Sequence, residues 1–435
     1  MEDTRSTSLS CEEDRIERVS TGRDAGCGIR VIANLRTYYA YTNELTEEAL
    51  LEVADLVASA LKDGHTEDIA LTKRSEFRGF DIRRRPEEEP LSEKVSLVWR
   101  GNNAARKVDK RIRQVKVSYR DAEKRSLIVN SLGEWVEHRN TYLVYAVHVV
   151  AEEGGVLQTG YEPVGGCIGL ELFEESPPEV VAEEAAKRAV MMLSARPAPG
   201  GRMMVVLSSE AGGTMIHEAV GHGLEADLAQ ESLSVYTGKL GREVASPLVT
   251  VIDDGTIPYK RGSAMFDDEG TPTQKTVLIE KGVLKSYMYD RLSAMKDGKS
   301  STGNGRRESY RHRPIPRMTN TMIAPGESDP EDVVRSVERG LFVKKMGGGQ
   351  VNTVNGDFVF EVSEGYLIEK GKIGEPVRGA TLTGSGPKVI RIIDMVASDL
   401  GFGIGTCGKD GQGVPVSDAQ PTLRIPEIVV GGAVK

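Results

Sequence analysis

Two histidines and a glutamate lie close together in the segment His217-Glu218-Ala219-Val220-Gly221-His222. The chain has only 6 histidines, and a random His-Glu-x-x-x-His is expected in about one of a hundred chains of this composition. Neutral imidazoles are zinc ligands, and an adjacent carboxylate that does not bind the metal can take a proton from an activated water. The segment therefore predicts a metal site in which Glu218 is the general base.

The spacing of the two histidines does not suit a regular helix. At about 100° per residue, the common HExxH spacing puts its histidines about 40° apart, whereas HExxxH separates them by about 140°. A π-type bulge or a helix end between His217 and His222 would remove this discrepancy, and Gly221 and Gly223 flank His222 where such a break would fall. We therefore expect a helix that is distorted or ends there.

A catalytic zinc ion needs a third protein ligand and keeps an open position for water. Gly212-Gly213 before the motif and two acids after it are typical of a site with close backbone approach and carboxylates that orient the ligands. The alternative is structural, with His217 capping a helix or bonded within the core. Spacing alone leaves the third ligand open among four residues: Glu225, Asp227, His312 and Cys407.

The first half of the chain predicts helices mixed with antiparallel strands. Residues 28–41 have the pattern of strand, turn and strand, and Thr46 begins a helix that runs to about Lys62. A charged helix around residues 92–113 leads into alternating segments, so His138 and His148 are expected on strands. Ser176-Pro177-Pro178-Glu179 has the form of a capping box and begins a helix that stops before Arg196.

The Pro/Gly segment at residues 196–200 predicts a domain boundary. It separates an amino-terminal α+β domain of residues 1–196 from a strand-rich carboxy-terminal domain of residues 200–435, which carries the metal-site helix. Sheets with segregated helices in each half favour the α+β class. In the second domain, strands are predicted at residues 248–253, 276–280 and 357–362, a capped helix from Ser328 to Gly340, and glycine-rich tight turns at residues 347–349 and 401–413.

Composition limits the classes of protein that remain. A net charge of −9 opposes nucleic acid as the main partner, because a phosphate backbone attracts clustered Lys and Arg. No stretch of about 20 apolar residues suggests a membrane span, and the polar opening has no signal-peptide core, so a cytoplasmic protein is expected. The 4 scattered cysteines show no disulfide or CxxC pattern.

Several motifs beyond the histidine segment resemble those of one family, the TldD/PmbA metallopeptidases, and specifically its TldD branch. The segment His217 to Glu225 is similar to that family's signature. Further similar motifs span residues 200–432: Val251 to Thr256, Asp267 to Pro272, Thr302 to Tyr310, Pro316 to Asn320, Gly347 to Val351, Gly379 to Leu382, Cys407 to Gln412 and Gln420 to Leu423. The amino-terminal half matches more loosely, through Gly26 to Val31 and Tyr41-Thr42-Asn43.

The resemblance implies a zinc-dependent peptidase that acts on small or unfolded peptides, with one zinc ion per chain. It implies that His217, His222 and Cys407 bind the zinc and that Glu218 is the general base. It also implies a heterodimer with a PmbA/TldE-like partner, with a homodimer as the fallback. The alternative is a noncatalytic binding or regulatory protein with a structural metal. One departure is that only about 25 mostly polar residues precede the glycine-led strand pair, where the family usually has a further helix and strand.

Overall fold

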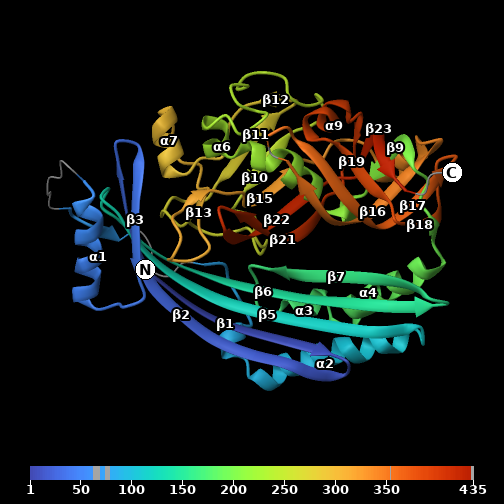
Figure 1. Cartoon of the computed structure of the whole chain (residues 1–435), viewed down its shortest axis with the longest axis horizontal. Helices are drawn as coiled ribbons and strands as arrows, with labels where there is room; N and C mark the ends of the chain where they lie inside the picture. The colour runs from blue at the N-terminus through green and yellow to red at the C-terminus, as the bar shows by residue number, and fades with distance from the viewer. Residues whose placement is uncertain (62–68, 74–78, 353, 433–435) are drawn as a thin grey trace.

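The computed structural model describes residues 1–61, 69–73, 79–352 and 354–432. A long, curved sheet from the amino-terminal half lies along one side of the molecule. The strands of the carboxy-terminal half pack together against one face of this sheet (Figure 1). Helices are fewer and lie mostly outside the sheets. The predicted α+β class is confirmed. Among the described residues, the longest and most apolar helices fall short of what crossing a bilayer requires.

The amino-terminal sheet has seven strands in the order β3-β2-β1-β5-β6-β4, with β7 also paired to β6. The pairs are antiparallel except for β4 beside β6. His138 and His148 both lie on β6, as predicted. The strands are β1 (Glu2–Glu12), β2 (Arg15–Ala33), β3 (Arg36–Thr42), β4 (Thr72–Lys73), β5 (Ile112–Val129), β6 (Glu134–Glu153) and β7 (Val156–Gly166).

The polar residues at the start of the chain form a central strand. Strand β1 pairs with β2 on one side and with β5 on the other, so it is fully integrated into the sheet. Its buried Leu9 and Cys11 face the helices, and on the same face Thr7 accepts a hydrogen bond from the buried Lys94. The first residues therefore supply a strand that their polar composition concealed.

Four helices accompany this sheet: α1 (Glu47–Ser59), α2 (Leu91–Val108), α3 (Leu172–Glu175) and α4 (Pro178–Ser194). The Thr46 side chain caps α1 as predicted, although that helix ends before Lys62. Helix α2 ends at Val108, earlier than predicted, because β5 begins at Ile112. Helix α4 has the predicted extent, but the capping box does not form, since Pro177 is its N-cap and supplies no side-chain hydrogen bond.

The sheet face that meets the carboxy-terminal half is polar and encloses a cavity of about 180 Å³. His138 on β6 lines it and is 2% exposed. Neither nitrogen of its ring has a hydrogen-bond partner among the described residues. Burial lowers the pKa of His138 to about 4 from 6.5, so the folded protein keeps the ring neutral near pH 5.

The free energy of unfolding is expected to depend on pH through His138. Because its pKa is depressed on folding, the stabilisation is complete above pH 6.5 and is lost as pH falls toward 4. Between pH 7 and pH 5 this one group costs about 2 kcal/mol. In urea unfolding, the free energy of unfolding of His138→Gln should therefore fall less between pH 7 and pH 5 than that of the unsubstituted chain, by about 2 kcal/mol. The control is His148→Gln on the same strand, and equal losses in all three proteins would contradict the expectation.

The carboxy-terminal half contains a six-stranded sheet in the order β12-β11-β10-β15-β22-β21 and an eight-stranded sheet. In the second sheet β16 pairs with β17, which closes β16, β9, β23, β19 and β17 into a barrel. The six-stranded sheet comprises β10 (Val251–Asp254), β11 (Lys275–Glu280), β12 (Val283–Leu284), β15 (Asn320–Ile323), β21 (Gly401–Lys409) and β22 (Gln412–Gln420). The eight-stranded sheet comprises β8 (Arg196–Pro197), β9 (Gly201–Leu207), β16 (Arg339–Val351), β17 (Asp357–Glu369), β18 (Lys372–Arg378), β19 (Thr381–Ser385), β20 (Met395–Val396) and β23 (Leu423–Gly431).

Three predictions for this half need correction. Helix α8 (Pro330–Arg335) is capped by Asp329, not Ser328, and it ends before Gly340 because strand β16 begins at Arg339. The glycines at 347–349 lie in β16, where its pairing with β17 is irregular, and not in a tight turn. Residues 401–413 form most of the β21–β22 hairpin, in which only the Asp410-Gly411 region turns. The glycines of these two segments therefore lie mainly in strands and not in turns.

The remaining elements are short. Apart from the two turns of the histidine segment, they are the single turns η1 (Pro86–Glu88) and η2 (Ser209–Ala211), the strand pair β13 (Gly305–Arg306) and β14 (Ile315–Pro316), and the helices α5 (Thr214–Ile216), α6 (Ala226–Gln230), α7 (Arg291–Asp297) and α9 (Gly386–Ile392). The predicted strands at residues 248–253, 276–280 and 357–362 correspond to β10, β11 and the first part of β17, with shifted ends.

Candidate metal centre

The helix that carries the two histidines is interrupted as predicted. Helix α5 gives way to one π turn, η3 (His217–Gly221), and then to one 3₁₀ turn, η4 (His222–Leu224). The backbone N–H of His222 donates to the carbonyl oxygen of His217, which is the i to i+5 bond of a π turn. Residues five apart consequently lie about one turn apart, and both imidazoles reach the same side.

Glycines allow this turn to pack closely against the surrounding strands. A side chain at Gly221 would place its Cβ 2.2 Å from the Met318 sulfur. At Gly213 a Cβ would lie 2.2 Å from the Ala419 nitrogen, and the Gly213 N–H donates to Asp418 on β22 at 3.0 Å. The helix start is therefore fixed to the strand next to β21.

Cys407 on β21 completes a cluster with the two histidines. One candidate ligand atom from each of His217, His222 and Cys407 lies within 4.8 Å of the others, and all three residues are buried. The Cys407 sulfur is 3.4 Å from Nε2 of His222, and the two imidazole planes meet at 89° with centroids 5.2 Å apart. Cys407 lies on strand β21, so it is not held in the glycine-rich turn that the sequence predicted at residues 401–413.

The other candidates for the third ligand lie around this cluster or away from it. Glu225 contacts the far nitrogen of His222, with its Oε2 3.0 Å from Nδ1. Asp227 accepts a hydrogen bond from Lys409 at 2.7 Å. His312 pairs with Ser309 at 3.1 Å and does not join the cluster. Glu225 thus contacts a candidate ligand as a carboxylate that orients a ligand does, whereas Asp227 is connected to it only through Lys409.

The charges at the cluster favour a bound cation. Burial alone would raise the pKa of the Cys407 thiol, but His217 and His222 hold that pKa at about 5. Burial favours neutral His222, yet Glu225 and Cys407 raise its pKa well above the usual value. Without a metal, protons on the imidazoles therefore balance the thiolate, and metal binding displaces such protons.

Glu218 differs from the three candidate ligands in its exposure. Its side chain is 29% exposed, and its Oε2 lies 3.9 Å from Nε2 of His222. This position is beside the cluster and open to solvent, as a base that exchanges protons with water requires. Arg306 and Tyr310, two polar residues from the Thr302 to Tyr310 motif, are engaged elsewhere: Arg306 donates to Pro415 and Tyr310 to Asp24.

Sequence reasoning did not find three charged residues around the cluster. Lys409 lies 3.2 Å from the Glu225 carboxylate, and Arg317 lies 4.0 Å from it. Asp418 is buried and its pKa is raised by burial, partly offset by His217. Lys409 and Arg317 both stand in family motifs, but a motif does not show which of its residues face one another.

The donor set fits a zinc ion. Imidazole nitrogens and thiolate sulfurs are common zinc ligands. Two of the former and one of the latter make three protein ligands, which leaves the fourth position open as in a catalytic site. Nδ1 of His217 is buried without a hydrogen-bond partner among the described residues, and a buried polar atom of this kind calls for a bound ion or water.

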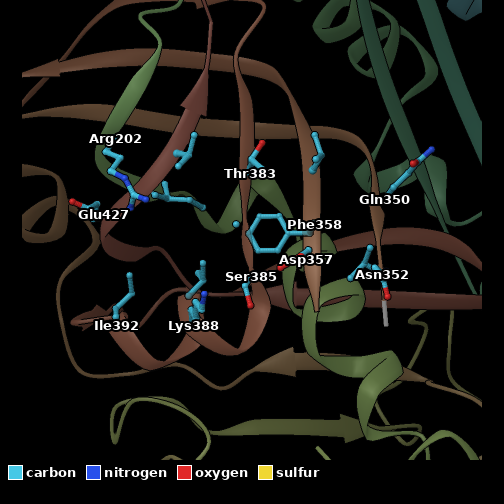
Figure 2. Close-up of a pocket in the computed structure, with 16 residues that line it drawn as sticks. Arg202, Gln350, Asn352, Asp357, Phe358, Thr383, Ser385, Lys388, Ile392 and Glu427 are labelled. Carbon is cyan, nitrogen blue, oxygen red and sulfur yellow. Dashed lines mark hydrogen bonds and ion pairs between the residues drawn. The ribbon is translucent and has the colours of Figure 1, made fainter. Parts of the chain in front are cut away.

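A cavity of about 760 Å³ is lined by none of the residues of the cluster (Figure 2). Strands β17, β19 and β23 and helix α9 border it, and the ring of Phe358 lies at its centre in the view. Helix α9 packs against the π turn, since a Cβ at Gly386 would lie 2.4 Å from the Ala219 oxygen. This cavity is therefore separate from the candidate metal centre.

Known protein families match nearly the whole chain. Residues 1–61 match PmbA/TldA metallopeptidase domain 1, residues 84–193 match the central domain of that family, and residues 200–432 match its C-terminal domain. A metalloprotease TldD homolog from Haemophilus influenzae is 42% identical over 97% of this chain and 89% of its own length. A metalloprotease from Methanothermobacter thermautotrophicus is 36% identical over 99% of this chain and 94% of its own length.

Solved structures share the fold. A Thermotoga maritima protein, named as a candidate modulator of a DNA gyrase, matches with a TM-score of 0.82 and 24% identity, over 99% of this chain and 94% of its own. TldE from Thermococcus kodakarensis matches with a TM-score of 0.75 and 20% identity, over 99% of this chain and 96% of its own. Together, the matched domains and the relatives above 30% identity show that the chain belongs to the TldD/PmbA family of metallopeptidases.

Proposed function

We propose that this chain is a zinc-dependent peptidase that hydrolyses small or unfolded peptides. His217, His222 and Cys407 would hold one zinc ion, and Glu218 would be the general base. The observation that carries the proposal is the buried cluster of two imidazoles and a low-pKa thiol, with a partly exposed glutamate beside it. A relative from Saccharolobus solfataricus, 28% identical over 98% of this chain and 94% of its own length, is named a zinc metalloprotease, which supports zinc as the metal.

The residues of the chain have separate tasks in this reaction. Zinc, when bound, would polarise the scissile carbonyl and make a water molecule more acidic. Glu218 takes the proton of the attacking water on its carboxylate and passes it to the amine that leaves. Glu225 keeps the ring of His222 in place through Nδ1, so the other ring nitrogen stays directed at the cluster.

An extended peptide could reach this site along β21. This strand is at the end of its sheet, and within the described residues it pairs only with β22. It also carries Cys407. A peptide that adds to a sheet edge is held mainly by main-chain hydrogen bonds, so this mode favours extended or unfolded substrates of varied sequence.

We further propose that the chain works as a heterodimer with a PmbA/TldE-like partner and supplies the metal site. The likeness to the fold of TldE supports a partner of similar architecture. A homodimer is the second candidate.

We also propose that the two domains are divided at residues 196–200, because the seven-stranded sheet and its helices precede this segment.

Removal of the metal tests the function directly. The chain, purified with its partner, is expected to degrade an unstructured peptide. A chelator should abolish this activity, and added zinc should restore it. The substrate would be followed by mass spectrometry and the bound metal by elemental analysis. Full hydrolysis by protein that has lost its metal would contradict the proposed function.

A further inference from the structure

We propose that Arg317 is a positioning residue that connects the two halves of the metal centre, and this inference rests on the proposed zinc site. One half is the π turn with His217 and His222, and the other is strand β21 with Cys407. Arg317 follows β14 and contacts both halves, one through Glu225 and the other through the backbone of Cys407. Its guanidinium would thereby set the separation between ligands that come from distant parts of the chain.

The first connection runs through Glu225. This carboxylate is completely buried, and its Oε2 holds Nδ1 of His222 at 3.0 Å. Its other oxygen, Oε1, has no hydrogen-bond partner among the described residues, and neither has Nε of Arg317. These two atoms lie 4.0 Å apart and carry opposite charges, so Arg317 and Glu225 form a buried ion pair.

The second connection runs to the strand that carries Cys407. One terminal nitrogen of Arg317 donates to the carbonyl oxygen of Cys407, and the other donates to the carbonyl of Gln412 at 3.2 Å. These two carbonyls belong to β21 and β22, on either side of the hairpin. The planar guanidinium can hold both at once because its donors form a rigid fork. Movement of Cys407 relative to Glu225 would break this arrangement.

Lys409 does not connect Glu225 to the backbone of Cys407 in the way that Arg317 does. It lies 3.2 Å from Glu225, but it also donates to Asp227 at 2.7 Å and to the Pro316 carbonyl at 3.1 Å. Its ammonium is shared among three acceptors and contacts no atom of Cys407 in the described structure. Arg317, at 0% exposure, is thus the cation that contacts both Glu225 and the Cys407 backbone.

The test compares Arg317→Met with Arg306→Met in the full chain. Arg306 is a matched control because it is also buried and also donates to backbone carbonyls, those of Met318 and Pro415, without contact to Glu225. Zinc affinity would be measured by competition with a chromophoric chelator. We expect Arg317→Met to weaken zinc binding about 10- to 100-fold, the usual effect of losing a group that orients a ligand. Arg306→Met should stay within about threefold, even if both variants are less stable.

Two further variants complete the experiment. Arg317→Lys keeps a charge but not the fork, so it should fold if Arg317→Met does not and should weaken zinc binding roughly threefold or more. Glu225→Gln combined with Arg317→Met should lose less than the product of the single losses, because the two residues are coupled. Folded Arg317 variants with unchanged zinc affinity would overturn the inference. An unsubstituted chain that binds no zinc would instead overturn the proposed function.

Discussion

Glu218→Gln is expected to lower kcat for peptide hydrolysis about 100- to 10,000-fold while the bound zinc remains in place. Glutamine has nearly the same shape, but its amide cannot accept the proton of the attacking water. The Glu218 side chain lies beside the cluster and is not among the three grouped ligand candidates, so its loss should leave the metal content unchanged.

The measurement is single-turnover hydrolysis of a peptide together with metal analysis of the same samples. Glu210→Gln is the matched control, since Glu210 lies shortly before the motif, is exposed, and has a distant ion pair with Lys344 at 3.9 Å. Unchanged kcat in Glu218→Gln would refute its role as the base. Loss of zinc along with activity would show instead that Glu218 is a ligand.

Cys407→Ala is expected to weaken zinc binding roughly 100- to 1,000-fold and to abolish hydrolysis at low zinc concentration. The estimate divides the affinity of about 10–16 kcal/mol for four-ligand zinc sites among their ligands. The thiolate form that zinc needs is already favoured near pH 7, since the pKa of Cys407 is held at about 5. Alanine removes both the ligand and this negative charge.

Cys167→Ala serves as the control for the loss of a buried cysteine. Cys167 is also buried, but burial raises the pKa of its thiol to about 12, and it is not in the metal cluster. Chelator competition would be run on both variants beside the unsubstituted chain. Equal zinc affinity in all three proteins would remove Cys407 from the site.

The broken helix at the metal centre could be predicted from sequence, whereas the third ligand could not. The angle between His217 and His222 in a regular helix and the glycine at 221 were enough to predict a helix that is distorted or ends there, because both are local properties. The structure realises this break as a π turn. Cys407 is distant in sequence and reaches the site only through the order of strands in the six-stranded sheet. Spacing contains no information on that order, so only family resemblance singled out Cys407.

Strand β1 shows a second limit of sequence reasoning. Strand prediction relies on alternating apolar residues, but one face of β1 meets the polar interface with the carboxy-terminal half, where Glu2 is buried and Thr4 lines a cavity. The pattern therefore disappears although the strand is central. Similarly, the glycines of β16 and β21 resembled turns, although they lie in strands that pair with the next strand of the chain, β17 and β22.

X-ray absorption at the zinc edge of the purified, metal-loaded chain would test the central claim most directly. The proposed site predicts one zinc ion per chain with two nitrogen ligands from imidazole at about 2.0–2.1 Å, one sulfur at about 2.3 Å and one light atom from solvent. The sulfur should disappear in Cys407→Ala. A shell without sulfur, or one closed by a fourth protein ligand as in a structural site, would contradict the account.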